Sequence, residues 1–210
     1  MDEHESDQTK PRPSRRPRDV SKQETREALI AAGISAFRDE GLDVPSLDSI
    51  CARAGYTRGA FYVHFKDRDD FLIAVMSNVV ERFMDAIIAT GDAALDLQKT
   101  IDTFVGAVTS NTFPMHGGVP LHQVLAACVR SNRVRERYVE VLREAVARVA
   151  NAAAEGQGAG TVRADVDAKH IGLILVGIVS GIQALLELEY PVPFEAAARD
   201  LSKLLKPSKG

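Results

Sequence analysis

Residues 54–72 have the sequence AGYTRGAFYVHFKDRDDFL, and this stretch decides the fold class of the N-terminal part of the chain. Gly55 lies between two apolar helical patterns, and glycine accepts the positive φ that a tight turn requires. Thr57 carries a hydroxyl that caps free N–H groups, so a short helix is expected from residue 58 to about residue 65. The pattern predicts a tight turn followed by a short helix.

A second short helix is predicted just before this turn. Residues 21–40 carry an apolar stripe at helical spacing, and Gly41 marks the end of that longer helix. Ser46 then caps a short helix whose inward residues are small or apolar, namely Leu47, Ile50, Cys51 and Ala54. Two short helices joined by a glycine turn are typical of a helix-turn-helix, which sets its second helix into the major groove of DNA.

The outer face of that second helix carries the groups expected to touch DNA. An arginine pairs with guanine or with phosphate, while tyrosine, histidine and lysine donate hydrogen bonds to phosphates. A glycine lets the backbone come close to the duplex. The residues predicted to bind DNA are Ser46, Thr57, Arg58, Gly59, Ala60, Tyr62, His64 and Lys66.

The spacing of these residues resembles the DNA-binding domain of TetR-family regulators. The run R-x-x-L-I-x-A-G-I-x-A-F-x-x-x-G extends from Arg26 to Gly41, and G-x-[ST]-x-G-[AT]-x-Y-x-[HY]-F is met from Gly55 to Phe65. The resemblance covers residues 21–75, about a quarter of the chain. It implies a homodimer that binds palindromic double-stranded operator DNA and is released by a small-molecule effector.

Two positions depart from the family pattern. Pro45 stands where such sequences often have threonine, so Ser46 has to supply the phosphate contact expected there. Val63 stands where a polar residue is frequent, which puts one further contact in doubt. Neither change threatens the fold.

The distribution of charge along the chain fits a DNA-binding N-terminal region. The whole chain has a net charge of −3, whereas residues 10–68 carry twelve Lys and Arg against eight Asp and Glu. Residues 1–20, with three prolines and an arginine cluster in PRPSRRPR, are predicted to be a disordered basic arm. This arm either solubilises the protein or follows DNA phosphates.

The remainder of the chain also shows helical patterns, so the fold class is predicted to be all-α. A DNA-binding domain is expected over residues 21–66, and a C-terminal ligand-binding and dimerisation domain over residues 67–210. Helices are expected over 67–90, 92–110, 119–131, 133–155, 167–188 and 194–205. Glycines at 156–160 are expected to break the chain between two of them. The helix from residue 67 joins both domains and is expected to act as the lever that transmits movement from one domain to the other.

Residues 171–186 form an apolar run that is shorter than the roughly 20 residues of a membrane span. We interpret it as a buried helix, packed either inside one chain or against a second copy. The small residues predicted at a dimer interface are Gly177, Ser180 and Gly181. The polar N-terminus and the two widely separated cysteines favour a cytoplasmic protein.

The C-terminal domain of TetR-like regulators usually holds the effector. Core packing is the alternative for each candidate side chain here. The candidates are Phe83, Ile87, Phe104, Val108, Phe113, Met115, His116, His122, Leu125, Cys128 and Tyr138. Cys128 also offers electrophile sensing as a further hypothesis. The His and Cys spacing predicts no metal site, and no cofactor is expected.

Two other classes of protein are alternatives to a regulator. An enzyme would need a nucleophile–base pair or a metal site, and the sequence has neither a G-x-S-x-G elbow nor a glycine-rich phosphate loop. A structural DNA-binding factor that recruits a protein partner would bind many sites without responding to a small molecule.

Overall fold

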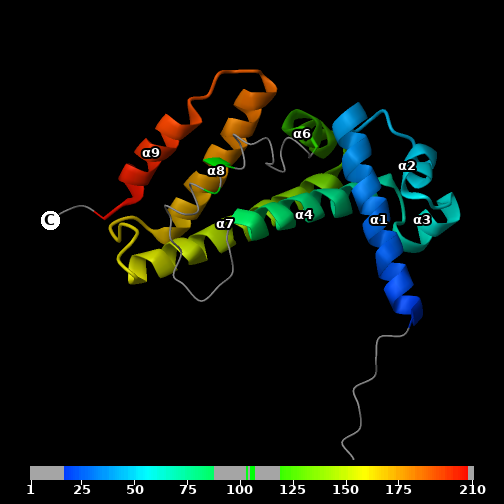
Figure 1. Cartoon of the computed structure of the whole chain (residues 1–210), viewed down its shortest axis with the longest axis horizontal. Coiled ribbons are helices and arrows are strands. Elements are labelled where there is room, and N and C mark those ends of the chain that lie inside the picture. The colour runs from blue at the N-terminus through cyan, green and yellow to red at the C-terminus, as the bar shows by residue number, and fades with distance from the viewer. Residues whose placement is uncertain (1–16, 88–102, 104, 107–118, 208–210) are drawn as a thin grey trace, which may run out of the picture.

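The computed structural model describes residues 17–87, 103, 105–106 and 119–207. In these residues the secondary structure is helical, in agreement with the all-α prediction (Figure 1). The helices are α1 (Pro17–Glu40), α2 (Leu47–Ala54), α3 (Arg58–His64), α4 (Arg68–Ile87), α6 (Leu121–Arg130), α7 (Asn132–Gly158), α8 (Ala168–Glu187) and α9 (Phe194–Leu205). Most of the predicted helix over residues 92–110 lies outside the described residues.

Helix α1 begins earlier than the sequence predicted. Its first residue is Pro17, so residues 17–20 are helical although they were assigned to the disordered arm. Proline is well tolerated in the first turn of a helix, because the N–H that it lacks has no partner there. The rest of the arm lies outside the described residues.

The helix-turn-helix is built around a cluster of four phenylalanines. Phe71 of α4 lies at its centre, with ring centroids 5.9 Å from Phe37 of α1, 5.2 Å from Phe61 of α3 and 5.0 Å from Phe65. All four side chains are at most 2% exposed. The first turns of α4 therefore pack in the same core as α1 and α3. The boundary predicted at residue 66 had assigned them to the C-terminal domain.

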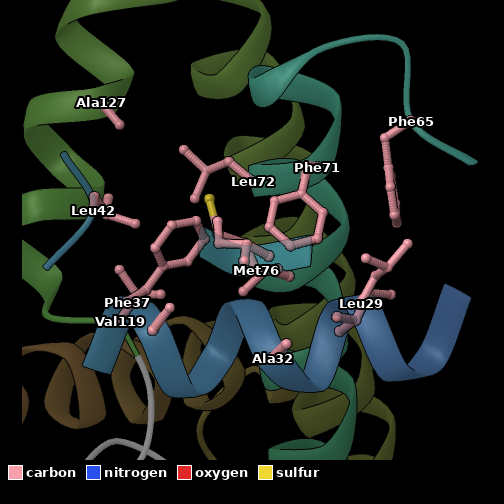
Figure 2. Close-up of a cluster of buried hydrophobic side chains, with 14 of the residues drawn as sticks. Leu29, Ala32, Phe37, Leu42, Phe65, Phe71, Leu72, Met76, Val119 and Ala127 are labelled. Carbon is pink, nitrogen blue, oxygen red and sulfur yellow. The ribbon is translucent and has the colours of Figure 1, made fainter. Parts of the chain in front are cut away.

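The same core continues into the C-terminal helices. Figure 2 shows Ala127 of α6 beside Leu42, and Val119, just before α6, close to Phe37. These side chains belong to one buried cluster with Phe37 and Leu42. The two predicted domains therefore share a continuous apolar contact through α6.

Helix α7 is longer than predicted. The break expected at residues 156–160 starts three residues later, because α7 continues to Gly158, and Ala159 and Gly160 form the turn that ends it. Gly156 is buried in the last turn, where an added Cβ would lie 2.6 Å from Cγ2 of Val162. This glycine therefore serves close packing of the following loop instead of ending the helix.

Helix α8 packs chiefly on α7. An added Cβ at Gly172 would lie 2.6 Å from the carbonyl oxygen of Val146, so the glycine allows the two backbones to approach. Elsewhere much of α8 is open: Leu173 is 61% and Ile174 53% exposed. By length and composition α8 could cross a membrane, and only 11% of its most apolar stretch is buried within the chain. Within the described residues, much of this helix is therefore left exposed.

The contact between Gly33 of α1 and Phe71 predicts a large effect of a small substitution. A Cβ at Gly33 would lie 2.8 Å from Cε1 of Phe71 and 3.2 Å from Cγ2 of Val75, both of them buried. We expect Gly33→Ala to lower the free energy of unfolding by about 1–3 kcal/mol, because overpacking outweighs the better helix propensity of alanine.

Urea denaturation of the full chain measures this change. Gly158→Ala is the matched control, since an added Cβ at that exposed helix end meets nothing within 4 Å. Equal stability of the two variants would contradict the packing argument.

Candidate nucleic-acid interface

The turn between α2 and α3 has the geometry that the sequence predicted. The Ser46 side chain accepts a hydrogen bond from the Ser49 N–H at 3.0 Å and so caps α2. Gly55 ends the helix with φ +77°, and its N–H donates to the carbonyl of Ala52 at 3.1 Å. The Tyr56 N–H donates to the carbonyl of Cys51 at 2.9 Å. These bonds fix the direction in which α3 leaves the turn.

Helix α3 is capped at one end and anchored in the middle. The Thr57 hydroxyl oxygen accepts from the Ala60 N–H at 3.2 Å, which leaves the hydroxyl proton available for a phosphate. Phe61 is fully buried in the aromatic cluster. Because Phe61 points inward, the opposite face of this short helix is turned to solvent.

The exposed face of α3 presents a cation beside an aromatic ring. Tyr62 is 50% exposed and Val63 63%. The Arg58 guanidinium carbon lies 5.9 Å from the centre of the Tyr62 ring, within the range of a cation–π interaction. Gly59 adds no side chain to this face, and a Cβ there would meet only the Thr57 hydroxyl, at 3.6 Å. The face can therefore approach the edges of bases closely.

Arg58 also has an acidic neighbour in the free protein. Its Nη1 lies 3.3 Å from a carboxylate oxygen of Asp48 on α2. More than half of each side chain is exposed. Ion pairs of this kind contribute little to stability, so a phosphate or a guanine can replace the carboxylate at low cost.

Two cations of α1, Lys22 and Arg26, act on His64 at the C-terminal end of α3. Burial lowers the pKa of His64, and the positive charges of Lys22 and Arg26 lower it further. Arg26 also lies over the ring of Phe65, 5.4 Å from its centre. The sequence analysis did not include either of these α1 cations among the DNA-binding candidates. Their i, i+4 spacing was visible, but their position beside His64 depends on how α1 packs.

Arg68 is another residue that the sequence analysis did not single out. Its guanidinium donates to the carbonyl oxygen of Pro45 at 2.7 Å and to that of Leu42, and lies over the ring of Phe37. Arg68 thus holds the backbone that leads into α2. Arginine is suited to this role because its donors are fixed in one plane.

The remaining predicted DNA-binding residues lie on or near α3. Lys66 follows the C-cap of α3 and is exposed, and its N–H donates to Asp70 at 3.0 Å. Ala60 is partly buried in α3. Of the eight predicted residues, five are in α3, Thr57 is its N-cap, Lys66 follows its C-cap, and Ser46 is the N-cap of α2.

The predicted effector residues are only partly described. Phe83 is half-buried on α4, whereas His122 and Leu125 are exposed on α6. Cys128 belongs to the buried cluster shared with the N-terminal helices, and the partly buried Tyr138 packs against that cluster. Burial raises the pKa of both groups. The remaining candidates, Ile87 (whose side chain is not described), Phe104, Val108, Phe113, Met115 and His116, fall outside the described side chains.

The burial of Cys128 bears on the hypothesis of electrophile sensing. A raised pKa keeps the thiol protonated, and the protonated thiol is a poor nucleophile. The environment of Cys128 therefore favours a packing role. Among the described residues, no group of three or more His, Cys, Asp or Glu side chains is placed to hold a metal ion.

The predicted dimer residues lie on the open part of α8. Gly177 and Gly181 are exposed, and a Cβ at either would meet nothing within 4 Å. The Ser180 hydroxyl donates to the Val176 carbonyl of the same helix at 3.0 Å. These residues thus make no contact with another helix of the described chain that would explain their small size.

A capped tight turn, a buried inner face and a polar outer face on the second helix together define a helix-turn-helix DNA-binding domain. The family of this domain follows from comparison with known proteins. Residues 29–75 match the model described as bacterial regulatory proteins, tetR family. The resemblance predicted from the sequence is confirmed over these residues, which are similar to the DNA-binding domain of TetR-family regulators.

Relatives of known sequence agree on this part of the chain. The uncharacterized HTH-type transcriptional regulator YwcC of Bacillus subtilis is 27% identical over 137 residues, which are 58% of this chain and 60% of YwcC. The HTH-type transcriptional repressor BepR of Brucella suis is 40% identical over 53 residues, a quarter of either chain. The matched segments thus span less than two thirds of each relative.

Solved structures extend the likeness to the whole fold. The regulatory protein TetR from Rhodobacter sphaeroides superposes with a TM-score of 0.69 at 20% identity, covering 86% of this chain and 98% of that one. SmeT, solved in complex with triclosan, gives a TM-score of 0.66 at 24% identity over 85% of this chain and 89% of its own. The C-terminal helices therefore follow the same architecture, although their sequences have diverged.

The lowered pKa of His64 predicts a dependence of stability on pH. The folded protein favours the neutral imidazole, while the unfolded chain takes up a proton near the ordinary pKa of 6.5. The stabilisation is therefore present above about pH 6.5 and is lost as the pH falls below it.

Urea denaturation between about pH 7.5 and pH 5.5 measures this effect. We expect His64→Gln to show a weaker loss of stability on acidification than the wild-type chain. His170→Gln, at an exposed histidine on α8, is the control. An unchanged pH dependence in His64→Gln would contradict the assignment.

Proposed function

We propose that this protein is a sequence-specific transcriptional repressor that leaves its operator when a small molecule binds. The observation that carries the proposal is the exposed face of α3, where Arg58, Gly59 and Tyr62 stand together on a helix fixed by two caps. A recognition helix needs both features, because base-edge contacts require side chains held in a defined position.

Specificity in this proposal comes chiefly from Arg58. A guanidinium offers two parallel donors that match the O6 and N7 acceptors of guanine in the major groove. Tyr62 supports the guanidinium by its ring and supplies a hydroxyl for a phosphate. Lys22, Arg26 and Lys66 add positive charge that holds the backbone of the duplex without reading its sequence.

The active form is proposed to be a homodimer that joins through α8. Of the glycines on this helix, Gly172 is used to approach α7, whereas Gly177 and Gly181 face open space in the described chain. Exposed Leu173 and Ile174 add apolar area that a second copy would remove from water. A two-fold dimer also presents two recognition helices to a palindromic site.

The effector is proposed to be a small apolar or amphipathic molecule bound among the C-terminal helices. SmeT, which has a similar fold, was solved with triclosan, an example of such a ligand. The effector acts by preferring the dimer form whose recognition helices are wrongly spaced for DNA. Couplings of this kind are commonly about 1–3 kcal/mol, set by the difference in affinity for the two forms. A regulator of this kind works in the cytoplasm, where bacterial DNA is located.

Selection from a randomised duplex library tests the proposed function. We expect a palindromic site to be enriched by the full-length protein at physiological salt. Arg58→Ala and Tyr62→Ala should each weaken binding to that site by about 1–3 kcal/mol, or roughly 5- to 150-fold. Arg199→Ala, at an exposed arginine on α9, is the matched control and should leave affinity unchanged.

The other outcomes distinguish the rival classes. Enrichment of many unrelated sequences would favour the structural DNA-binding factor. No binding by any form would overturn the proposal. If a palindromic operator is selected, binding to it provides the assay in which triclosan-like compounds are screened for release of the DNA.

The dimer is tested separately, by sedimentation. Gly181→Leu places a bulky side chain on the open part of α8, where no atom of the described chain lies within 4 Å of the added Cβ. We expect the dissociation constant of the dimer to rise at least about tenfold while the monomer stays folded. Ala164→Leu, in the exposed loop before α8, is the control. A wild-type chain that sediments as a monomer would contradict this part of the proposal.

A further inference from the structure

The loop between α1 and α2 is held from two sides. It begins at Gly41, with φ +84°, and ends at the buried Pro45, just before the cap of α2. On one side Arg68 of α4 donates to carbonyl oxygens of this loop. On the other side the loop meets Gln123 of α6. Since α2 starts where the loop ends, whatever positions the loop also positions the helix-turn-helix.

The contact with Gln123 is close and specific. Its side-chain carbonyl oxygen accepts the N–H of Leu42 at 2.5 Å, and Leu42 itself is 3% exposed. A Cβ at Gly41 would lie 3.0 Å from both polar atoms of the Gln123 amide. The positive φ and the close approach together favour glycine at position 41. A second contact on the same side joins Arg130 of α6 to Asp43 at 2.8 Å.

The first turn of α6, which carries Gln123, is also tied to α8. Pro120 precedes the helix and offers no side-chain cap. In its place the carboxylate of Glu187 accepts hydrogen bonds from the N–H groups of Leu121 and His122. One oxygen of this carboxylate also lies 2.8 Å from Nδ1 of His122. Glu187 is the last residue of α8. A carboxylate from a distant helix therefore caps α6, and the positive end of the α6 dipole strengthens the contact.

Helix α6 thus lies between the end of α8 and the loop before α2 (Figure 1), and its first turn contacts both. We propose that Gln123 is a positioning residue through which the location of α8 is transmitted to the helix-turn-helix. The proposal rests on the proposed function, since it concerns how DNA binding is controlled. It adds a second route to the one expected through α4. In this second route, the hydrogen bond from the Leu42 N–H to Gln123 joins the first turn of α6 to the loop.

The mechanism follows from the two attachments. When the end of α8 moves, Glu187 carries the N-terminus of α6 with it, because the carboxylate holds two N–H groups and a ring nitrogen of that turn. A helix of ten residues moves as one body, so Gln123 shifts with its first turn. The Leu42 N–H then either moves with the Gln123 oxygen or loses its hydrogen bond to that oxygen. Either result changes the start of α2 relative to the rest of the protein.

Hydrogen exchange of residues 38–46 in the full chain tests this route without DNA. Gln123→Met removes the acceptor, and Gln123→Glu keeps an acceptor oxygen. We expect Gln123→Met to speed exchange of the Leu42 N–H several-fold and Gln123→Glu to restore protection. The distant substitution Glu187→Ala should also speed this exchange, and should have no further effect when combined with Gln123→Met. Glu195→Ala on α9, whose side chain is 76% exposed, is the control and should leave the exchange unchanged.

The combination of substitutions separates coupling from local structure. Merely structural roles at the two positions would give additive effects, whereas a shared route gives a non-additive cycle. An additive cycle, or an unchanged Leu42 exchange in Glu187→Ala, would overturn the proposal. Far-UV circular dichroism checks that each variant is folded.

Operator affinity provides the second measurement. We expect Gln123→Met to change binding to the selected site by about 2- to 30-fold, with recovery in Gln123→Glu. If no operator is found while the exchange cycle is non-additive, the proposed function fails and the structural coupling stands. If the operator is bound equally by Gln123→Met, Gln123→Glu and the wild-type chain, Gln123 does not control DNA binding.

Discussion

The packing of Phe71 against α1 is the contact on which the rest of the structure depends. Its ring lies among three other phenylalanines and directly over Gly33, which has no side chain to keep α1 away. This one residue of α4 therefore fixes α1 and α3 relative to the long helix that leads to the C-terminal domain. Because protein interiors are closely packed, a shift of α4 cannot be absorbed inside the cluster and has to move the recognition helix.

Polar contacts complement this apolar centre at its edges. Arg133 pairs with Asp67 through two nitrogens, and the Ser131 hydroxyl donates to Asp69 at 2.7 Å, so the start of α7 is tied to the start of α4. Arg53 similarly joins α2 to the end of α1 through Asp39 at 2.9 Å. Such exposed pairs contribute little to stability, but their fixed geometry specifies which helices meet. The apolar cluster holds the domain together, and the polar pairs set its orientation.

Local chemistry explains why much of the site could be predicted from the sequence. The caps at Ser46 and Thr57 and the left-handed Gly55 depend on residues within three positions of one another. By contrast, Gln123 and Leu42 are 81 positions apart, and nothing in either local pattern indicates that they meet. The same holds for Glu187, which resembled an ordinary polar end of α8 and is the cap of α6. Proline and glycine misled the prediction at Pro17 and Gly156, because both residues are compatible with helices near their ends.

The pairing of Arg58 with Asp48 has a consequence for how the protein searches for its site. The carboxylate competes with every phosphate that approaches the guanidinium, whatever the base sequence beneath it. This competition lowers the affinity for all DNA by a small amount. In the proposed function, only a site that adds base contacts, such as a guanine placed to accept from Arg58, makes up the difference. An acidic neighbour that looks unfavourable in a DNA-binding face thus shortens the residence of the protein on wrong sites and leaves more of it free to sample the chromosome.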